Sequence, residues 1–151
     1  MPRLVILFFA SALIGCTGNS GPPSVAETSA NKELLGDRIE FVETYVKFRR
    51  QYNRLEYDIF FQNNGGIPPG PSDWDIRLVA DVPPGDLTDW ISQGMTPGIS
   101  PVDSWHQKIA NEIDISNVTE WYIDGGRSVG IDRDNSIVVY RNHTWGVTSA
   151  E

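Results

Sequence analysis

VTEWYIDGGRSVGIDRDNSIVVYR, residues 118–141, contains three apolar runs separated by two short turn sequences. The runs cover residues 118–123, 127–132 and 137–141, and they are rich in the β-branched and aromatic residues that favour strands. Asp124-Gly125-Gly126 and the sequence RDNS at 133–136 suit tight hairpin turns, because Gly, Asn and Asp tolerate positive φ. This stretch therefore predicts a three-stranded antiparallel meander.

Two more strands are predicted before the meander, at residues 55–62 (LEYDIFFQ) and 73–82 (DWDIRLVADV). The Gly- and Pro-rich residues 63–72 between them, and a second such stretch at 93–101, are interpreted as long loops, because proline cannot pair within a sheet. Side chains alternate along a strand, so one face of the second strand carries Trp74, Ile76, Leu78 and Ala80.

A long helix is predicted before these strands, because apolar residues between Ile39 and Tyr52 recur at threes and fours. Asp37 and Glu40 have the spacing of a capping box at its start. The basic sequence KFRR at 47–50 suits the negative end of the helix dipole. The β-branched and aromatic content of this segment leaves a strand as the alternative.

Short helical segments are expected at residues 86–91, where Asp86 can act as the cap, and at residues 102–113. The second segment is ambiguous, with Asp103 as its candidate cap. A helix is favoured there because three apolar residues lie four apart: Trp105, Ile109 and Ile113.

The fold class that follows is α+β, with one domain over residues 32–151. We expect an antiparallel sheet of about five strands ending in the meander. The long helix and one or two short helices are expected to pack on one face of this sheet.

The chain begins with a short apolar run, MPRLVILFFASALIGC at residues 1–16, in which Arg3 is the only charge. The run is shorter than the roughly 20 apolar residues of a transmembrane helix and is typical of an export signal. Leu13-Ile14-Gly15-Cys16 resembles the lipobox of bacterial lipoprotein precursors. The resemblance implies removal of residues 1–15 and lipid attachment to the Cys16 sulfur. Cys16 is the only cysteine, so it has no disulfide partner within the chain.

Residues 16–31 are predicted to be a flexible tether of roughly 20 Å, because small and polar residues dominate them. The mature chain would carry eleven basic and twenty acidic residues, a formal charge of −9. Such a surface repels nucleic acid and anionic lipid headgroups. Solubility alone is the favoured explanation of this charge, and a cationic protein partner is the alternative. Thr17 stands after Cys16 where an Asp would signal inner-membrane retention, so the resemblance favours the outer membrane, facing the periplasm, in a cell that has one.

Asp73 and Asp75 flank Trp74 at the mouth of the loop 63–72. Carboxylates two apart on a strand point the same way, about 7 Å apart, which is within the range that some glycosidases use. A cell-wall hydrolase with Trp74 stacking a sugar is therefore one hypothesis. The alternative is that the pair caps the loop and forms a salt bridge with Arg77, and this reading is favoured.

No catalytic residue, metal site or cofactor is predicted. The sequence DRDNS at 132–136 has the first alternating oxygens of a calcium loop, but Ile137 and His143 stand where Gly and Glu are needed. A hairpin turn explains it better. His106 and His143 lie in no zinc-ligand spacing.

Recognition of another molecule is expected from the loops 63–72 and 93–101, because long loops in a compact domain are often functional. The binding candidates are Trp74, Asp73, Asp75, Asn64 and Trp145, the last lying beyond the final strand. The favoured hypothesis is a non-enzymatic, lipid-anchored envelope protein of the immunity or inhibitor kind. The alternatives are the hydrolase and a structural part of an envelope assembly.

Overall fold

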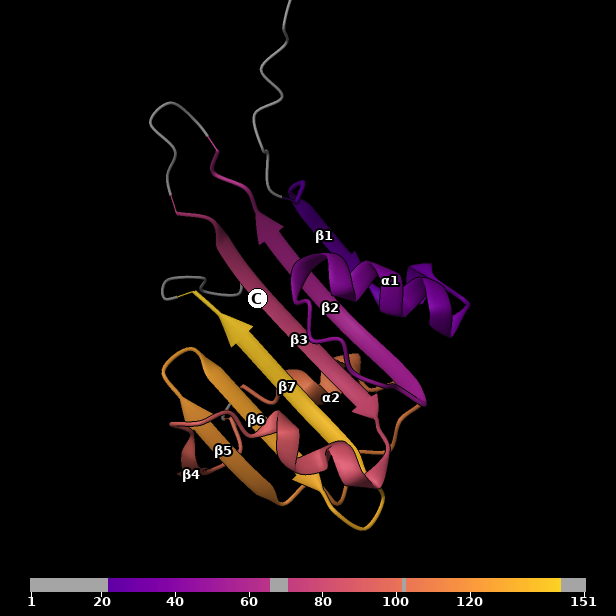
Figure 1. Cartoon of the computed structure of the whole chain (residues 1–151), viewed down its shortest axis with the longest axis vertical. Coiled ribbons are helices and arrows are strands. Elements are labelled where there is room, and N and C mark those ends of the chain that lie inside the picture. Colours follow the sequence, from indigo (N-terminus) through magenta and orange to yellow (C-terminus); the bar gives the residue numbers. More distant parts are fainter. Residues whose placement is uncertain (1–21, 66–70, 102, 145–151) are drawn as a thin grey trace, which may run out of the picture.

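The computed structural model describes residues 22–65, 71–101 and 103–144. Their strands form one antiparallel sheet of seven, in the order β1-β2-β3-β7-β6-β5-β4 (Figure 1). The strand bounds are β1 Val25–Thr28, β2 Arg54–Gln62, β3 Asp73–Asp81, β4 Thr96–Gly98, β5 Glu120–Asp124, β6 Arg127–Asp132 and β7 Ile137–His143. The predicted meander is confirmed as β5, β6 and β7, and β7 joins it to β3.

The sheet buries a separate hydrophobic core on each of its faces. On β3 and β7, Leu78 and Tyr140 belong to one core, whereas Val79 and Val139 belong to the other. This division follows from the alternation of side chains along paired strands, since Leu78 lies opposite Tyr140 and Val79 opposite Val139. Where both cores meet the central strands, residues 78–80 and 137–140 are consequently continuous apolar runs.

Helices cover both faces, which corrects the expectation that they share one. The 11-residue helix α1 (Leu35–Tyr45) and the 3-10 helix η2 (Pro84–Trp90) pack on the face that we call the α1 face. The short helix α2 (Trp105–Ile109) lies behind the sheet in Figure 1, on what we call the α2 face. The class is α+β, as predicted.

The predicted long helix ends seven residues earlier than Tyr52, at Tyr45. Lys47 and Arg49 have φ of 49° and 54°, so the backbone turns sharply where a longer helix would continue. Phe48 and Tyr52 still reach the core, from an irregular segment. The capping box is also wrong: Leu34 is the N-cap, and no side chain caps the helix.

Two edge strands were not predicted. β1 pairs with β2 within residues that were expected to be tether, and Ser29–Asn31 continue it as the 3-10 turn η1. The predicted tether is therefore wrong for residues 25–31, while residues 16–21 lie outside the described ranges. β4 pairs with β5 inside the expected loop 93–101.

The short helices form where they were expected, with different ends. η2 begins at Pro84, after Pro83 as the N-cap, so Asp86 does not cap it. α2 has five residues and Ser104 as its N-cap, and Asp103 forms an ion pair elsewhere. Ile113 is buried with α2 although it lies outside that helix. Neither α-helix of the described ranges is long and apolar enough to cross a bilayer.

Candidate functional site

Two of the predicted binding residues, Asn64 and Asp73, come together where β2 and β3 meet the loop between them. The Asn64 amide donates to the Pro71 carbonyl oxygen at 2.8 Å and to the Asp73 carboxylate at 3.1 Å. The Thr144 hydroxyl donates to the other Asp73 oxygen at 3.4 Å. These contacts hold the ends of the two strands together, which is the loop-capping role expected for Asp73.

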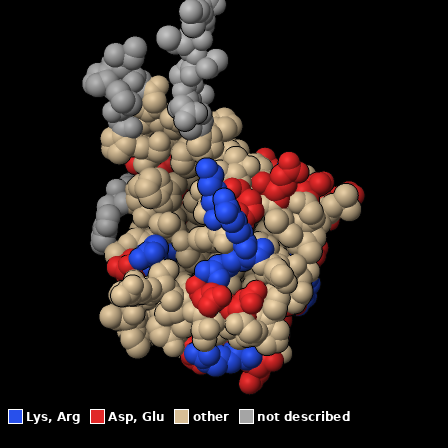
Figure 2. Space-filling model, viewed as in Figure 1, with Lys and Arg blue, Asp and Glu red and all other residues tan. Residues whose placement is uncertain are grey.

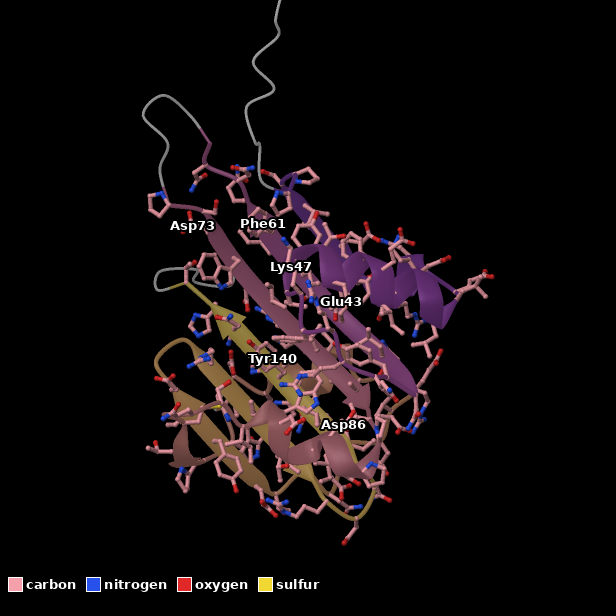
Figure 3. The ribbon with its side chains drawn as sticks, in the orientation of Figure 1. Glu43, Lys47, Phe61, Asp73, Asp86 and Tyr140 are labelled. Atoms are coloured by element: carbon pink, nitrogen blue, oxygen red, sulfur yellow. The ribbon has the colours of Figure 1, made fainter. Side chains whose placement is uncertain are left out.

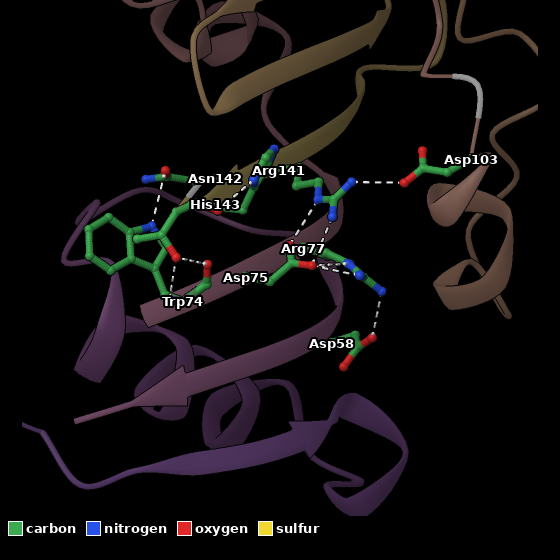
Figure 4. Close-up of polar contacts among 9 residues, drawn as sticks. Asp58, Trp74, Asp75, Arg77, Asp103, Arg141, Asn142 and His143 are labelled. Carbon is green, nitrogen blue, oxygen red and sulfur yellow. Dashed lines mark hydrogen bonds and ion pairs between the residues drawn. The ribbon is translucent and has the colours of Figure 1, made fainter. Parts of the chain in front are cut away.

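Asp75 lies on the α2 face and is almost fully buried, with 3% of its surface exposed. Its carboxylate accepts two hydrogen bonds from Arg77, at 2.6 and 3.0 Å, and two from Arg141, both at 2.9 Å (Figure 4). Arg77 also donates to Asp58 at 3.2 Å, and Arg141 donates to Asp103 at 2.9 Å. The predicted Asp75–Arg77 salt bridge is confirmed, within a network that joins β2, β3 and β7 to the segment before α2.

The network determines the ionisation of its carboxylates. Burial alone would raise the pKa of Asp75, but hydrogen bonds and charges from Arg141 and Arg77 outweigh it and lower this pKa. Burial raises the pKa of Asp58, because Arg77 compensates it only in part. A general acid in glycoside hydrolysis needs a raised pKa and access to substrate. Asp75 has neither, so its geometry is that of a structural ion pair.

Trp74 points away from both carboxylates, into the α1 face. Its indole N–H donates to the Asn142 side-chain oxygen at 3.2 Å. Trp74 is therefore not placed to stack a sugar between Asp73 and Asp75. Trp145 and Cys16 lie outside the described residues.

The side chain of Trp74 instead lines an aromatic pocket of about 240 Å³ on the α1 face. Alternation on three paired strands brings most of its walls together, since Phe61 lies opposite Trp74, and Ile76 opposite Asn142. Helix α1 contributes only its last turn, so the sheet stays uncovered beyond it. The pocket is lined by Tyr45, Val46, Phe48, Phe61, Trp74, Ile76, Tyr140 and Asn142.

Aromatic rings support one another around this pocket. Tyr45 and Phe61 have ring centroids 5.4 Å apart, and Phe48 meets Tyr140 edge-on at 5.0 Å. Trp90 of η2 backs them, 5.3 Å from Phe48. Burial raises the pKa of the Tyr140 hydroxyl, which keeps it neutral at ordinary pH. The pocket is thus mainly apolar, and Asn142 contributes an amide to its lining.

A basic segment, residues 47–50, borders the pocket. In the view of Figure 3, Lys47 lies beside Glu43 and between Phe61 and Tyr140, and Figure 2 shows a row of basic side chains across this face with acidic groups to its right and below it. Both Glu43 oxygens accept the Arg49 backbone N–H, at 2.9 and 3.0 Å. The Arg50 guanidinium lies 4.8 Å from the Trp90 ring centre and donates to the Asp89 carbonyl oxygen at 2.5 Å.

The basic segment also forms one wall of an open polar hollow of about 670 Å³, with η2 opposite. Phe48 lines both the hollow and the aromatic pocket, so they lie on either side of it. Non-glycine residues with positive φ cost roughly 1–3 kcal/mol each and persist only where surrounding contacts hold them. Such strain often marks a functional site, and Lys47 and Arg49 stand between two hollows. The hollow is lined by Phe48, Arg49, Arg50, Gln51, Asp86, Thr88, Asp89, Ile91, Ser92 and Gln93.

Sequence reasoning found Trp74 but missed the rest of this site. The pattern assigned the basic segment to a helix end, and no local signal reveals the turn at Lys47 and Arg49. Phe61 and Tyr140 were part of predicted strands, so alternation could have placed them on the face of Trp74. Alternation along the sequence does not show that β3 pairs with β7, and this pairing brings Asn142 to the pocket.

The remaining candidates have structural roles. The Asp132 carboxylate accepts the backbone N–H groups of Asp134 and Asn135 at 3.0 and 3.1 Å, which confirms the turn interpretation of residues 132–136. His106 is buried between Trp105 and Trp121, and burial lowers its pKa. Among the described residues, no three His, Cys, Asp or Glu side chains gather as a metal site would need.

No protein family, curated protein or solved structure matches the chain in comparisons of its sequence and its fold.

Proposed function

We propose that this chain is a lipid-anchored, non-enzymatic binding module of the bacterial cell envelope. It binds a protein partner through the aromatic pocket and the adjoining basic segment. The observation that carries this proposal is the strained backbone at Lys47 and Arg49, held between an apolar pocket and a charged hollow. Preformed pockets of this kind receive the central anchor residues of protein interfaces.

The size and lining of the pocket favour a protein side chain over a small molecule. Sites for small ligands usually enclose about 300–1,000 Å³, and this one encloses about 240 Å³. Its walls are mostly aromatic, and the polar groups among them are the Asn142 amide, the Trp74 indole N–H and the tyrosine hydroxyls. An aromatic or aliphatic side chain of the partner fits this volume and chemistry.

Acidic groups farther out on this face, beyond the basic segment, favour a partner that carries basic residues at the rim of its interface. Asp37, Glu40 and Asp89 are exposed on α1 and η2, and the mature chain carries a formal charge of −9. Opposite charges at the rim of an interface raise the association rate and select the partner. A cationic toxin or hydrolase in the periplasm has this chemistry, as an immunity or inhibitor function requires.

The contacts of Asp75 favour binding over wall hydrolysis, because its carboxylate is already ion-paired with Arg77 and Arg141 and is not available to a substrate. No observation favours a structural role in a larger assembly. That role would be supported instead if cross-linking in cells joined the chain to a stable, stoichiometric partner that is itself built of many copies.

The test of partner binding compares two neighbouring phenylalanines. Phe61 lines the pocket, whereas Phe60 lies on the opposite face of β2 and is 39% exposed. Residues 17–151 are immobilised, incubated with envelope extract at low salt, and the retained proteins are identified by mass spectrometry. We expect wild type and Phe60→Gln to retain the same cationic protein and Phe61→Gln to lose it. Equal retention by both variants, or none by wild type, would refute the pocket as the binding site.

The anchor has its own test. Cys16→Ala should leave the domain folded and move it from the membrane fraction to the soluble fraction. A variant that still sediments with membranes shows that lipid on Cys16 is not what holds the protein.

A further inference from the structure

We infer that one end of the sheet lies against the membrane surface; this inference rests on the lipid anchor proposed above. The tether end, as we call it, is where β1 begins, β2 ends, β3 begins and β7 ends (Figure 1). The partner of this surface is a lipid headgroup layer.

The start of the folded chain is fixed at the tether end by three hydrogen bonds. Asn63 donates its backbone N–H to the Ser24 hydroxyl at 2.8 Å and its side-chain amide to the Pro22 carbonyl oxygen at 3.0 Å. The Tyr45 hydroxyl donates to the Pro23 carbonyl oxygen at 3.3 Å. Residues 22–31 therefore belong to the domain, which extends at least ten residues before the start expected from the sequence.

Five residues then remain between Cys16 and Pro22. When fully extended, six peptide links span at most about 20 Å. A domain of this size has a diameter of roughly 35 Å. The tether is shorter than the domain, so its attachment end must stay near the bilayer while the opposite end points away.

The chemistry of the two ends agrees with this orientation. Where the chain leaves the domain, most surface atoms belong to uncharged residues (Figure 2). At the strand ends there, Asp73 is hydrogen-bonded to Asn64 and Thr144, and Asp124 is paired with Arg127.

Unlike the tether end, the opposite end of the sheet is rich in exposed charge. Its exposed residues include Arg54, Glu112, Asp114, Arg133 and Asp134. Carboxylates held there lie beyond the Debye length of about 8 Å from an anionic surface, so repulsion is small. A net negative protein can thus rest against an anionic membrane.

The test uses the single cysteine. The mature chain, residues 16–151, is coupled through Cys16 to a maleimide lipid in phosphatidylcholine vesicles. The control is the same chain capped with a soluble maleimide and mixed with the same vesicles. Hydrogen exchange is followed by mass spectrometry. We expect exchange in residues 60–65 and 71–75 to slow several-fold on coupling, and exchange in residues 132–137 to stay unchanged.

A second protein carries about twenty extra Gly and Ser residues after Thr17, which raises the fully extended reach of the tether to roughly 88 Å, well beyond the diameter of the domain. Its exchange should return to the level of the soluble control, because the domain can then rotate. Unchanged exchange at the tether end of the original protein, or slowing at residues 132–137, overturns the orientation. Because the coupling is chemical, these outcomes do not depend on whether Cys16 is lipidated in the cell.

Discussion

Replacement of Asp75 by Asn tests whether the buried ion network is structural. The Asn side chain keeps the size of Asp but removes the charge that both Arg77 and Arg141 pair with. The side chains of these arginines are 15% and 11% exposed, so water compensates them poorly. We expect the domain to stay folded in water but to lose much of its free energy of unfolding.

The expected loss is about 3–5 kcal/mol, which is typical when one partner of a buried ion pair is removed. Asp58 provides the matched control, because it pairs with the same Arg77 but is 35% exposed. Exposed pairs contribute about 1 kcal/mol or less, so Asp58→Asn should change stability little. Domains of this kind are stable by about 5–15 kcal/mol, so the Asp75 change removes a large part of the total.

Urea unfolding followed by tryptophan fluorescence measures both variants. With an m-value of about 1.5 kcal/mol per molar urea, Asp75→Asn should lower the midpoint by roughly 2–3 M. Arg141→Gln added to it should cost less than it does alone, because its main partner is already gone. A midpoint for Asp75→Asn within the range of Asp58→Asn would show that the arginines are solvated and would refute this reasoning. Because Asp75→Asn is expected to destabilise the fold, an assay of wall hydrolysis should use Asp73→Asn instead.

Three further outcomes are expected. In the folded protein the pKa of Asp75 is below its ordinary value of 3.8. The stabilisation of the fold by the Asp75 carboxylate is therefore present above that pH and is lost as pH falls through the folded pKa. Urea midpoints measured between pH 6 and 3 should drop more steeply for wild type than for Asp75→Asn. Glu43→Ala removes the acceptor of the Arg49 backbone N–H and should cost about 1 kcal/mol, whereas exposed Glu40→Ala should stay within about 0.5 kcal/mol; equal midpoints would show that Glu43 does not hold the basic segment. A chain starting at Lys32 lacks β1 and exposes the edge of β2, so it should melt lower and aggregate more than a chain starting at Pro22, as light scattering during heating would reveal.

The strands of the centre could be predicted because their residues obey a local rule. Trp74, Ile76, Leu78 and Ala80 share one face of β3 by the period of two, and Gly125 has the φ of 54° that the turn before β6 requires. The edge strands β1 and β4 have no such pattern. Val25–Thr28 and Thr96–Gly98 are short, partly exposed and next to Pro or Gly. They become strands because β2 and β5 have edges with backbone groups free to pair with them, and amino-acid composition does not reveal such an edge.

The predicted helix was too long because Phe48 and Tyr52 continue the helical spacing. Both side chains do reach the core, but they do so from an irregular segment in which Lys47 and Arg49 have left-handed backbone conformations. Charged residues at such positions are uncommon and carry no recognisable sequence signal. The pocket could not be predicted for the same reason, since it depends on the early end of α1.

β7 is the last of the described strands in sequence order, yet it lies in the middle of the sheet between β3 and β6. Until residues 137–143 are available, a growing chain has two half-sheets with unpaired inner edges and neither core complete. Completion of the fold is thus delayed until residues 137–143 have been made, because non-local strand pairing cannot begin before both strands exist. If the chain is exported unfolded to the envelope, the location proposed above, this order of events keeps the polypeptide threadable while it is on the ribosome. Ribosome-bound chains ending before residue 137 should accordingly remain sensitive to protease.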